Sequence, residues 1–212
     1  MIPSDVKKPD FLREKASYTV RTQQHGDSPL PCPVGITSYK EVVSECYYVD
    51  KTLLLRQMID DHSKVFLFTR PRRFGKTMMD MVRTFFERST EDTSVYFTDK
   101  KIWTCGEKYR ELQGKYPVIF LSFKDAHQTS WEAMYKSLCF TLREEFVRHR
   151  ELLESDALNE YDRRFFQNIT EDKAEITDYQ YALGKLSAML TTCYQSKTII
   201  IICLLYTSDA AD

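Results

Sequence analysis

KVFLFTRPRRFGKTMMDMVRTFF, residues 64–86, carries the clearest structural signals in the chain. Its first part, Val65–Phe68, is a short apolar run of the kind that forms a buried strand. After a basic turn, apolar residues recur at helical spacing, which predicts a helix that lays one face against a sheet. These residues are Met78, Met81, Val82, Phe85 and Phe86. The order of strand, loop and helix indicates an α/β fold.

The loop between the two elements ends in Gly75, Lys76 and Thr77, the chemical half of a phosphate-binding loop. A glycine lets backbone N–H groups approach a phosphate, a lysine reaches the β and γ phosphates, and a threonine hydroxyl can ligate Mg²⁺. The positive end of the helix dipole then faces the anion. Arg70 stands where the general pattern GxxxxGK[ST] has its first glycine. On spacing alone, a strand-to-helix turn with a solvated basic patch is therefore an alternative.

Four sequence features together resemble the AAA-ATPase-like family of bacterial proteins. They are TRPRRFGKT, VGITSYKEV upstream of it, YYVDKTLLL before the strand, and the aromatic pair Phe85 and Phe86. In that family RPRRFGK[ST] replaces the glycine-rich loop, so Arg70 is a mark of the family. The resemblance covers Pro33 to Ile202 and implies a P-loop domain that uses ATP and Mg²⁺.

The resemblance also implies roles for the loop residues. Lys76, the catalytic residue, would neutralise the β and γ phosphates, and Thr77 would be the metal ligand. The nucleotide-binding loop would consist of Arg70, Pro71, Arg72, Arg73, Phe74, Gly75, Lys76 and Thr77. Its arginines could add charge at the phosphates or pair with acids on neighbouring loops, and both alternatives stay open.

Two further apolar runs predict buried strands, PVIFLSF at 117–123 and TIIII at 198–202. With helical segments between them, the chain has the alternating order of a doubly wound fold. We therefore expect an α/β fold with a P-loop NTPase-type parallel sheet and helices on both faces. Its strands would lie at Val65–Phe68, Val118–Ser122 and Thr198–Ile202, with the sheet truncated after this third strand.

Five other segments are predicted to be helical from their periodicity and flanking residues. They are Ser38–Glu45, Lys51–Ile59, Ser130–Leu153, Asp156–Phe166 and Asp178–Cys193. The charge cluster REEFVRHRE, residues 143–151, is typical of a solvated helix face with pairs at i and i+4.

Asp50 stands where the N-cap of the 51–59 helix belongs. The alternative rests on the family resemblance alone and places Tyr48, Asp50 and Lys51 near the nucleotide base or ribose.

Composition limits the classes of function. With 30 basic and 31 acidic residues, the chain has no overall charge to attract nucleic acid, so such a partner would need a local patch or regions outside this chain. No stretch approaches the ~20 apolar residues of a membrane span, and the N-terminus lacks a signal peptide, which favours a cytoplasmic protein without membrane contact. The six cysteines form no CxxC pair and the four histidines no ligand spacing, so neither zinc nor disulfides are expected.

The two ends differ from the middle. Residues 1–33 are polar and proline-rich, which predicts a flexible leader, and residues 34–202 form the incomplete P-loop domain. Residues 203–212, CLLYTSDAAD, match the translation of an adapter used to prepare sequencing libraries, and we expect an adapter-derived tail. Members of the family continue the isoleucine run with Asp-Glu, where this chain has Cys203 and Leu204, and often carry a nuclease-like C-terminal domain.

Three functions follow as hypotheses. The first is that the parent protein is an ATPase, of which this chain lacks the acids that hold Mg²⁺ and activate water. The second is a nucleotide-dependent switch or scaffold with little turnover. The third is the ATPase module of a nucleic-acid-processing protein.

Overall fold

The computed structural model describes residues 30–33, 35–61, 63–69, 75–123 and 130–204. The chain divides into two compact units, an N-terminal unit, Met1–Lys115, and a C-terminal unit, Tyr116–Asp212. Each unit is described by itself. That residues 34–202 form one domain stays a prediction.

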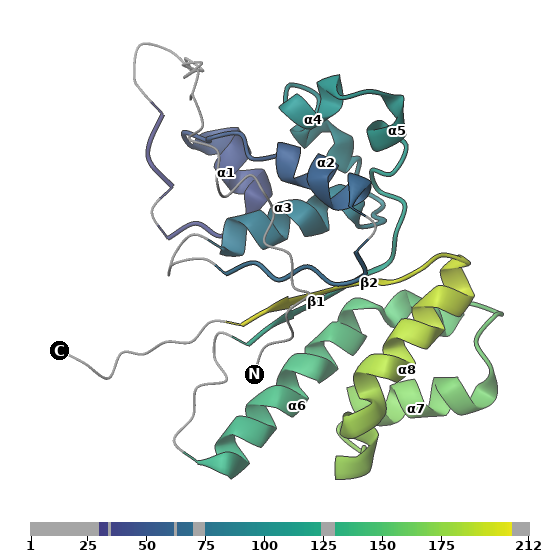
Figure 1. Cartoon of the computed structure of the whole chain (residues 1–212). Coiled ribbons are helices and arrows are strands. Elements are labelled where there is room, and N and C mark those ends of the chain that lie inside the picture. The colour runs from purple at the N-terminus through teal and green to yellow at the C-terminus, as the bar shows by residue number, and fades with distance from the viewer. Residues whose placement is uncertain (1–29, 34, 62, 70–74, 124–129, 205–212) are drawn as a thin grey trace. The chain divides into compact units, whose positions relative to one another are not determined.

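The N-terminal unit is helical in its described part (Figure 1). Helix α1 lies against α3, and α2 lies against α4. Ser38 starts α1 as an N-cap, since its hydroxyl accepts the N–H of Glu41 at 3.4 Å, so this helix begins where the sequence predicted. The elements are α1 (Tyr39–Glu45), α2 (Leu53–Asp60), α3 (Lys76–Phe86), η2 (Thr93–Tyr96), α4 (Lys101–Thr104) and α5 (Glu107–Arg110).

Aromatic rings form the core of this unit. Tyr39 of α1 stacks on Phe97, with ring centroids 5.1 Å apart, and Phe85 of α3 meets the same Phe97 ring edge-on at 5.1 Å. All three side chains are fully buried. The predicted apolar face of α3 is confirmed, because its five residues are all buried: Met78, Met81, Val82, Phe85 and Phe86.

The predicted strand at Val65–Phe68 is wrong. The segment forms no strand, and the sheet of the described residues has two strands. Val65 is 82% exposed and Leu67 46%, while Phe66 and Phe68 are half-buried and stack on each other at 6.4 Å. Apolar content did not predict strand pairing here, since a strand also needs a neighbour for its N–H and C=O groups.

The C-terminal unit holds that sheet. Strands β1 and β2 pair in parallel, with Val118 opposite Ile199 and Ser122 opposite Cys203. The predicted strand at Val118–Ser122 is confirmed, and the isoleucine strand lies one residue later than predicted. The elements are β1 (Val118–Ser122), α6 (Trp131–Arg148), η3 (Arg150–Glu154), α7 (Glu160–Thr170), α8 (Ile176–Tyr194) and β2 (Ile199–Cys203).

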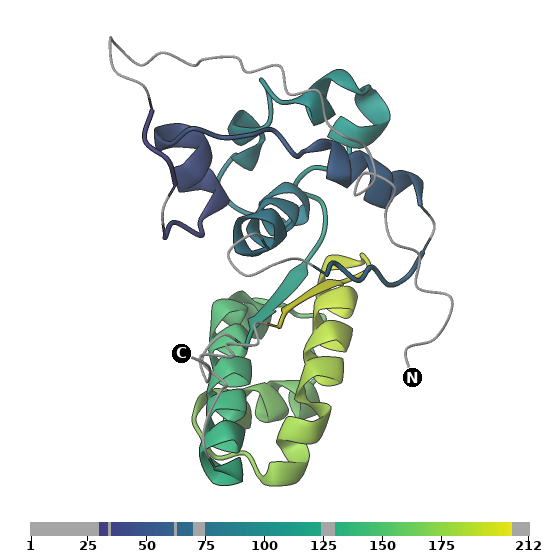
Figure 2. The ribbon, with the colours of Figure 1, turned by 60° about the vertical axis from the view of Figure 1, so that its left-hand side comes forward.

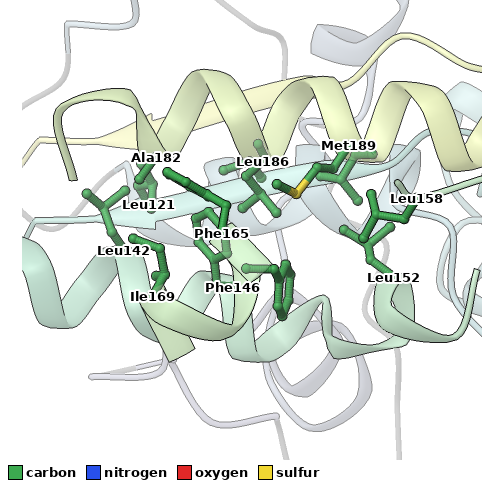
Figure 3. Packing of buried hydrophobic residues seen from close by; sticks show 13 residues of the cluster. Leu121, Leu142, Phe146, Leu152, Leu158, Phe165, Ile169, Ala182, Leu186 and Met189 are labelled. Atoms are coloured by element: carbon green, nitrogen blue, oxygen red, sulfur yellow. The ribbon is translucent and has the colours of Figure 1, made fainter. Parts of the chain in front are cut away.

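Helices α6, α7 and α8 gather on one side of the two strands (Figures 1 and 2). Figure 3 shows their side chains pointing toward one another and toward Leu121 of β1. Phe146 of α6 is central to this core, because its ring lies 5.1 Å from that of Phe166 and 6.3 Å from that of Phe165. Among the described residues of this unit, helices cover one face of the sheet. A helical layer on the other face stays a prediction.

Two predicted helices differ from the structure by more than two residues at an end, whereas α2 and α8 differ from the predicted Lys51–Ile59 and Asp178–Cys193 by one or two. The segment expected to be one helix from Ser130 to Leu153 is α6 followed by the 3-10 turn η3, with His149 between them. The helix expected from Asp156 begins at Glu160, because the side chain of Asn159 accepts the N–H of Asp162 at 2.8 Å and caps it. Both differences come from local hydrogen bonds that periodicity does not encode.

The prediction of a solvated face for REEFVRHRE is also wrong in its middle. Glu145 and His149 are 5% and 6% exposed. Glu145 accepts the backbone N–H of Phe120 at 2.7 Å, and the ring of His149 lies 3.2 Å from the carbonyl oxygen of Val118. These two side chains therefore contact the backbone of strand β1 and do not face solvent.

Candidate nucleotide site at the start of α3

Helix α3 begins at Lys76, with Gly75 as its N-cap, as the sequence predicted. A glycine N-cap has no side chain to accept the N–H groups of the first turn, and that turn carries no acidic residue. The N–H groups of residues 76–78 lack intrahelical acceptors by helix geometry, and they carry the positive end of the dipole. Gly75, Lys76 and Thr77 are half-buried, so part of each residue is accessible to solvent among the described residues.

The remaining predicted loop residues, Arg70, Pro71, Arg72, Arg73 and Phe74, lie outside the described residues. Their roles stay a prediction. The same holds for the expectation that the Lys76 side chain points back over the loop.

Sequence reasoning did not identify the contacts between α3 and the segment Ile36–Tyr39. The hydroxyl of Thr77 donates to the carbonyl oxygen of Ile36 at 3.5 Å. Three residues further along α3, the carboxylate of Asp80 accepts the backbone N–H of Tyr39 at 2.7 Å. The helical spacing of Thr77 and Asp80, which puts both on one side of α3, was the available signal.

Asp80 is itself held in place. The guanidinium of Arg83 lies 3.7 Å from its carboxylate and donates to Glu87 at 3.0 Å. Because Tyr39 is the first residue of α1, the negative charge of Asp80 also lies at the positive end of that helix. One carboxylate therefore joins the start of α1 to the second turn of α3.

Residues 33–205 match the AAA-ATPase-like family, described as predicted AAA-ATPases. This match covers most of the chain. The chain belongs to the AAA-ATPase-like family. No curated protein and no solved structure matches it.

In this AAA-ATPase-like chain, Asp50 has a structural role different from the predicted one. Helix α2 begins at Leu53, and Thr52 rather than Asp50 occupies its N-cap position. Asp50 accepts both the N–H and the hydroxyl of Thr52, at 2.8 and 2.7 Å, and its other oxygen accepts the N–H of Lys101 at 2.8 Å. The Thr52 hydroxyl in turn accepts the N–H of Ile102 at 3.1 Å. Asp50 and Thr52 thus tie the start of α2 to the start of α4.

Tyr48 also packs inside the N-terminal unit. Its ring meets Tyr39 edge-on at 5.5 Å, and its hydroxyl lies 3.4 Å from the sulfur of Met81. Burial raises the pKa of both tyrosines, so they stay neutral. With Asp50 engaged as above, the placement of these residues near a base or ribose stays a prediction.

The AAA-ATPase-like family suggests nucleotide binding, usually with Mg²⁺. Thr77 fits a cation of this kind, because a hydroxyl that gives its proton to Ile36 keeps lone pairs on a hard oxygen ligand. Among the described residues, no three His, Cys, Asp or Glu side chains cluster as a metal site. In the same part of the chain, no helix has the length and apolarity to cross a membrane.

The residues at the end of β2 are poorer metal ligands than Thr77. Cys203 is the last residue of the strand; its side chain is buried, and its carbonyl oxygen accepts the N–H of Phe123 at 3.0 Å. Leu204 follows and is 58% exposed. A neutral thiol and an alkyl group are poor ligands for Mg²⁺.

Proposed function

We propose that this chain is an ATP-binding P-loop module whose parent protein is an ATPase. The observation that carries the proposal is the start of α3 at Gly75, Lys76 and Thr77 in a chain of the AAA-ATPase-like family. The N–H groups of the first turn would bind phosphate oxygens, and Lys76 would neutralise the β and γ phosphates. Thr77 would hold Mg²⁺, which bridges β and γ oxygens when bound.

A second candidate is a nucleotide-dependent switch that binds ATP and turns it over slowly. It uses the same phosphate site as the first candidate, since Gly75, Lys76 and Thr77 would bind ATP under both. Under this alternative the free energy of ATP binding, rather than hydrolysis, would shift the conformation seen by a partner.

Lys76→Ala tests nucleotide binding. Because the lysine carries the side-chain charge at the phosphates, we expect its loss to weaken ATP binding by about 10²-fold, measured by isothermal titration calorimetry. Lys136→Ala is the matched control, since Lys136 is an exposed lysine of α6 in the other unit. Equal affinity of the two variants for ATP, or no binding by the unmodified chain, would refute the proposal.

Phosphate release by a full-length member of the family separates the two candidates, because this chain has Cys203 and Leu204 where the catalytic acids are expected and would turn ATP over slowly under both. Turnover on the order of 1 s⁻¹, a common rate for ATP-using enzymes, supports the ATPase. Binding with turnover lower by several orders of magnitude supports the switch.

A further inference from the structure

The segment Ile36–Tyr39 is held at both ends by the first two turns of α3. At one end, the Ile36 carbonyl accepts the Thr77 hydroxyl at 3.5 Å. At the other end, the Tyr39 N–H donates to Asp80 at 2.7 Å. The first contact is at the outer limit of hydrogen-bond distance, whereas the second is short and has a charged acceptor, so the second is the stronger restraint.

The two contacts are linked through a short piece of backbone. Ser38 and Tyr39 begin α1, and the buried Tyr39 ring fixes that helix in the core. Without the bond from the Tyr39 N–H to Asp80, the backbone between Ile36 and Tyr39 would have one restraint fewer, and the Ile36 carbonyl would be held less closely beside Thr77. The Thr77 hydroxyl would then direct its proton to Ile36 less firmly, and its lone pairs would be oriented less well.

We propose that Asp80 is a positioning residue for the metal ligand of the phosphate site. By holding Tyr39, it keeps the Ile36 carbonyl where it accepts the Thr77 proton, so that the hydroxyl oxygen presents its lone pairs to Mg²⁺. This rests on the function proposed above. Asp80 itself touches neither nucleotide nor metal; it acts through backbone and through Thr77, as groups behind a metal ligand generally do.

The test compares ATP affinity with and without Mg²⁺ for Asp80→Ala and Asp80→Asn. Asp80→Ala removes the acceptor, and we expect the gain in affinity that Mg²⁺ confers to fall about tenfold, with Mg²⁺-free affinity unchanged. Asp80→Asn keeps an oxygen that can accept the Tyr39 N–H, so it should retain most of the gain. An equal loss in both variants, or no loss in Asp80→Ala, would overturn the proposal.

A double-mutant cycle adds a second check. In a Thr77→Ala background, Asp80→Ala should have no further effect on the Mg²⁺-linked gain, because the hydroxyl it positions is gone. Additive losses would show that Asp80 acts by another route.

The unmodified chain supplies a readout that does not depend on any variant folding. By linkage, if the contact between Asp80 and Tyr39 strengthens Mg²⁺ binding, bound Mg²⁺ strengthens that contact. Hydrogen exchange of the Tyr39 amide should therefore be several-fold slower with Mg²⁺ and ATP than with ATP alone. Identical exchange would overturn the positioning role. Absence of any ATP binding would instead refute the proposed function.

Discussion

The carboxylate of Glu145 on α6 accepts the backbone N–H of Phe120 on β1 at 2.7 Å. At the two ends of β1, the odd-numbered residues Pro117 and Phe123 hydrogen-bond to β2. In a parallel pair, alternate residues of a strand direct their N–H and C=O groups to the same side, so those of the even-numbered residues point to the other edge of β1. Arg148 donates to the carbonyl oxygen of Val118 on that edge and also pairs with Glu145. Buried charge therefore covers the outer edge of β1.

Glu145→Gln should destabilise the C-terminal unit by about 3 kcal/mol. The amide can still accept the Phe120 N–H, but Arg148 and His149 lose their counter-charge in a buried place. Urea unfolding followed by circular dichroism measures the free energy. The control is Glu144→Gln, because Glu144 is the exposed neighbour on the same helix and its replacement should change stability by less than about 0.5 kcal/mol.

The charged residues Glu145, Arg148 and His149 predict a pH range in which the C-terminal unit is most stable. Burial alone would raise the pKa of Glu145, but hydrogen bonds from His149, Arg148 and the Phe120 amide outweigh it and lower the pKa to about 2. Burial also opposes the charged form of His149, yet its contacts with Glu145 and Glu151 raise the pKa of the imidazole, against the opposing charge of Arg148.

These shifts have opposite consequences. The contribution of Glu145 to the free energy of unfolding is present above its unfolded pKa of about 4.3 and is lost as pH falls toward 2. The contribution of His149 is complete below its unfolded pKa of about 6.5 and is lost as pH rises through its raised pKa. Thermal unfolding should thus show the largest contribution of the pair between about pH 4.5 and 6.5. His149→Gln should remove the decline on the alkaline side, and an unchanged alkaline decline would contradict this.

Asp50→Ala should lower the stability of the N-terminal unit by about 2 kcal/mol. The substitution removes the acceptor of three hydrogen bonds, one of which reaches the start of α4. Asp92→Ala is a matched control, because Asp92 also accepts the N–H and hydroxyl of a residue two positions on, Ser94, at 3.0 and 2.6 Å, in an exposed turn. Similar losses of unfolding free energy in both variants would show that the contact with α4 contributes nothing.

Acids at the end of β2 should raise turnover. We expect Cys203→Asp with Leu204→Glu to increase phosphate release by about 10²-fold or more, because the pair supplies a hard metal ligand and a proton acceptor. Cys203→Asn with Leu204→Gln changes shape in the same way without the charges and should stay at the rate of the unmodified chain. Equal rates for the two double variants would place the catalytic acids elsewhere.

The sequence predicted those features that depend on local pattern. The apolar face of α3, its start at Lys76 and the strand at Val118–Ser122 all follow from periodicity and glycine placement. It failed where distant residues decide the outcome. Val65–Phe68 has the composition of a strand but no strand pairing. Glu145 is of a residue type typical of surfaces, yet it is buried and accepts the N–H of Phe120 on β1.

The candidate site divides in the same way. Lys76 and Thr77 were found from motif chemistry, whereas Asp80 was missed because its partner is a backbone amide 41 positions earlier in the chain. A backbone donor leaves no mark in the sequence. Only the packing of α1 on α3 brings the two groups together.

The side chains that contact the outer edge of β1 also affect the solubility of the protein. An open strand edge is a template for pairing with another chain, and the neighbouring strand is four consecutive isoleucines, of which Ile200 and Ile202 are 43% and 46% exposed. Glu145, Arg148 and His149 withhold the polar groups of Phe120 and Val118 from such pairing. Their loss would therefore show itself first as aggregation at high protein concentration, before any change in ligand binding could be measured.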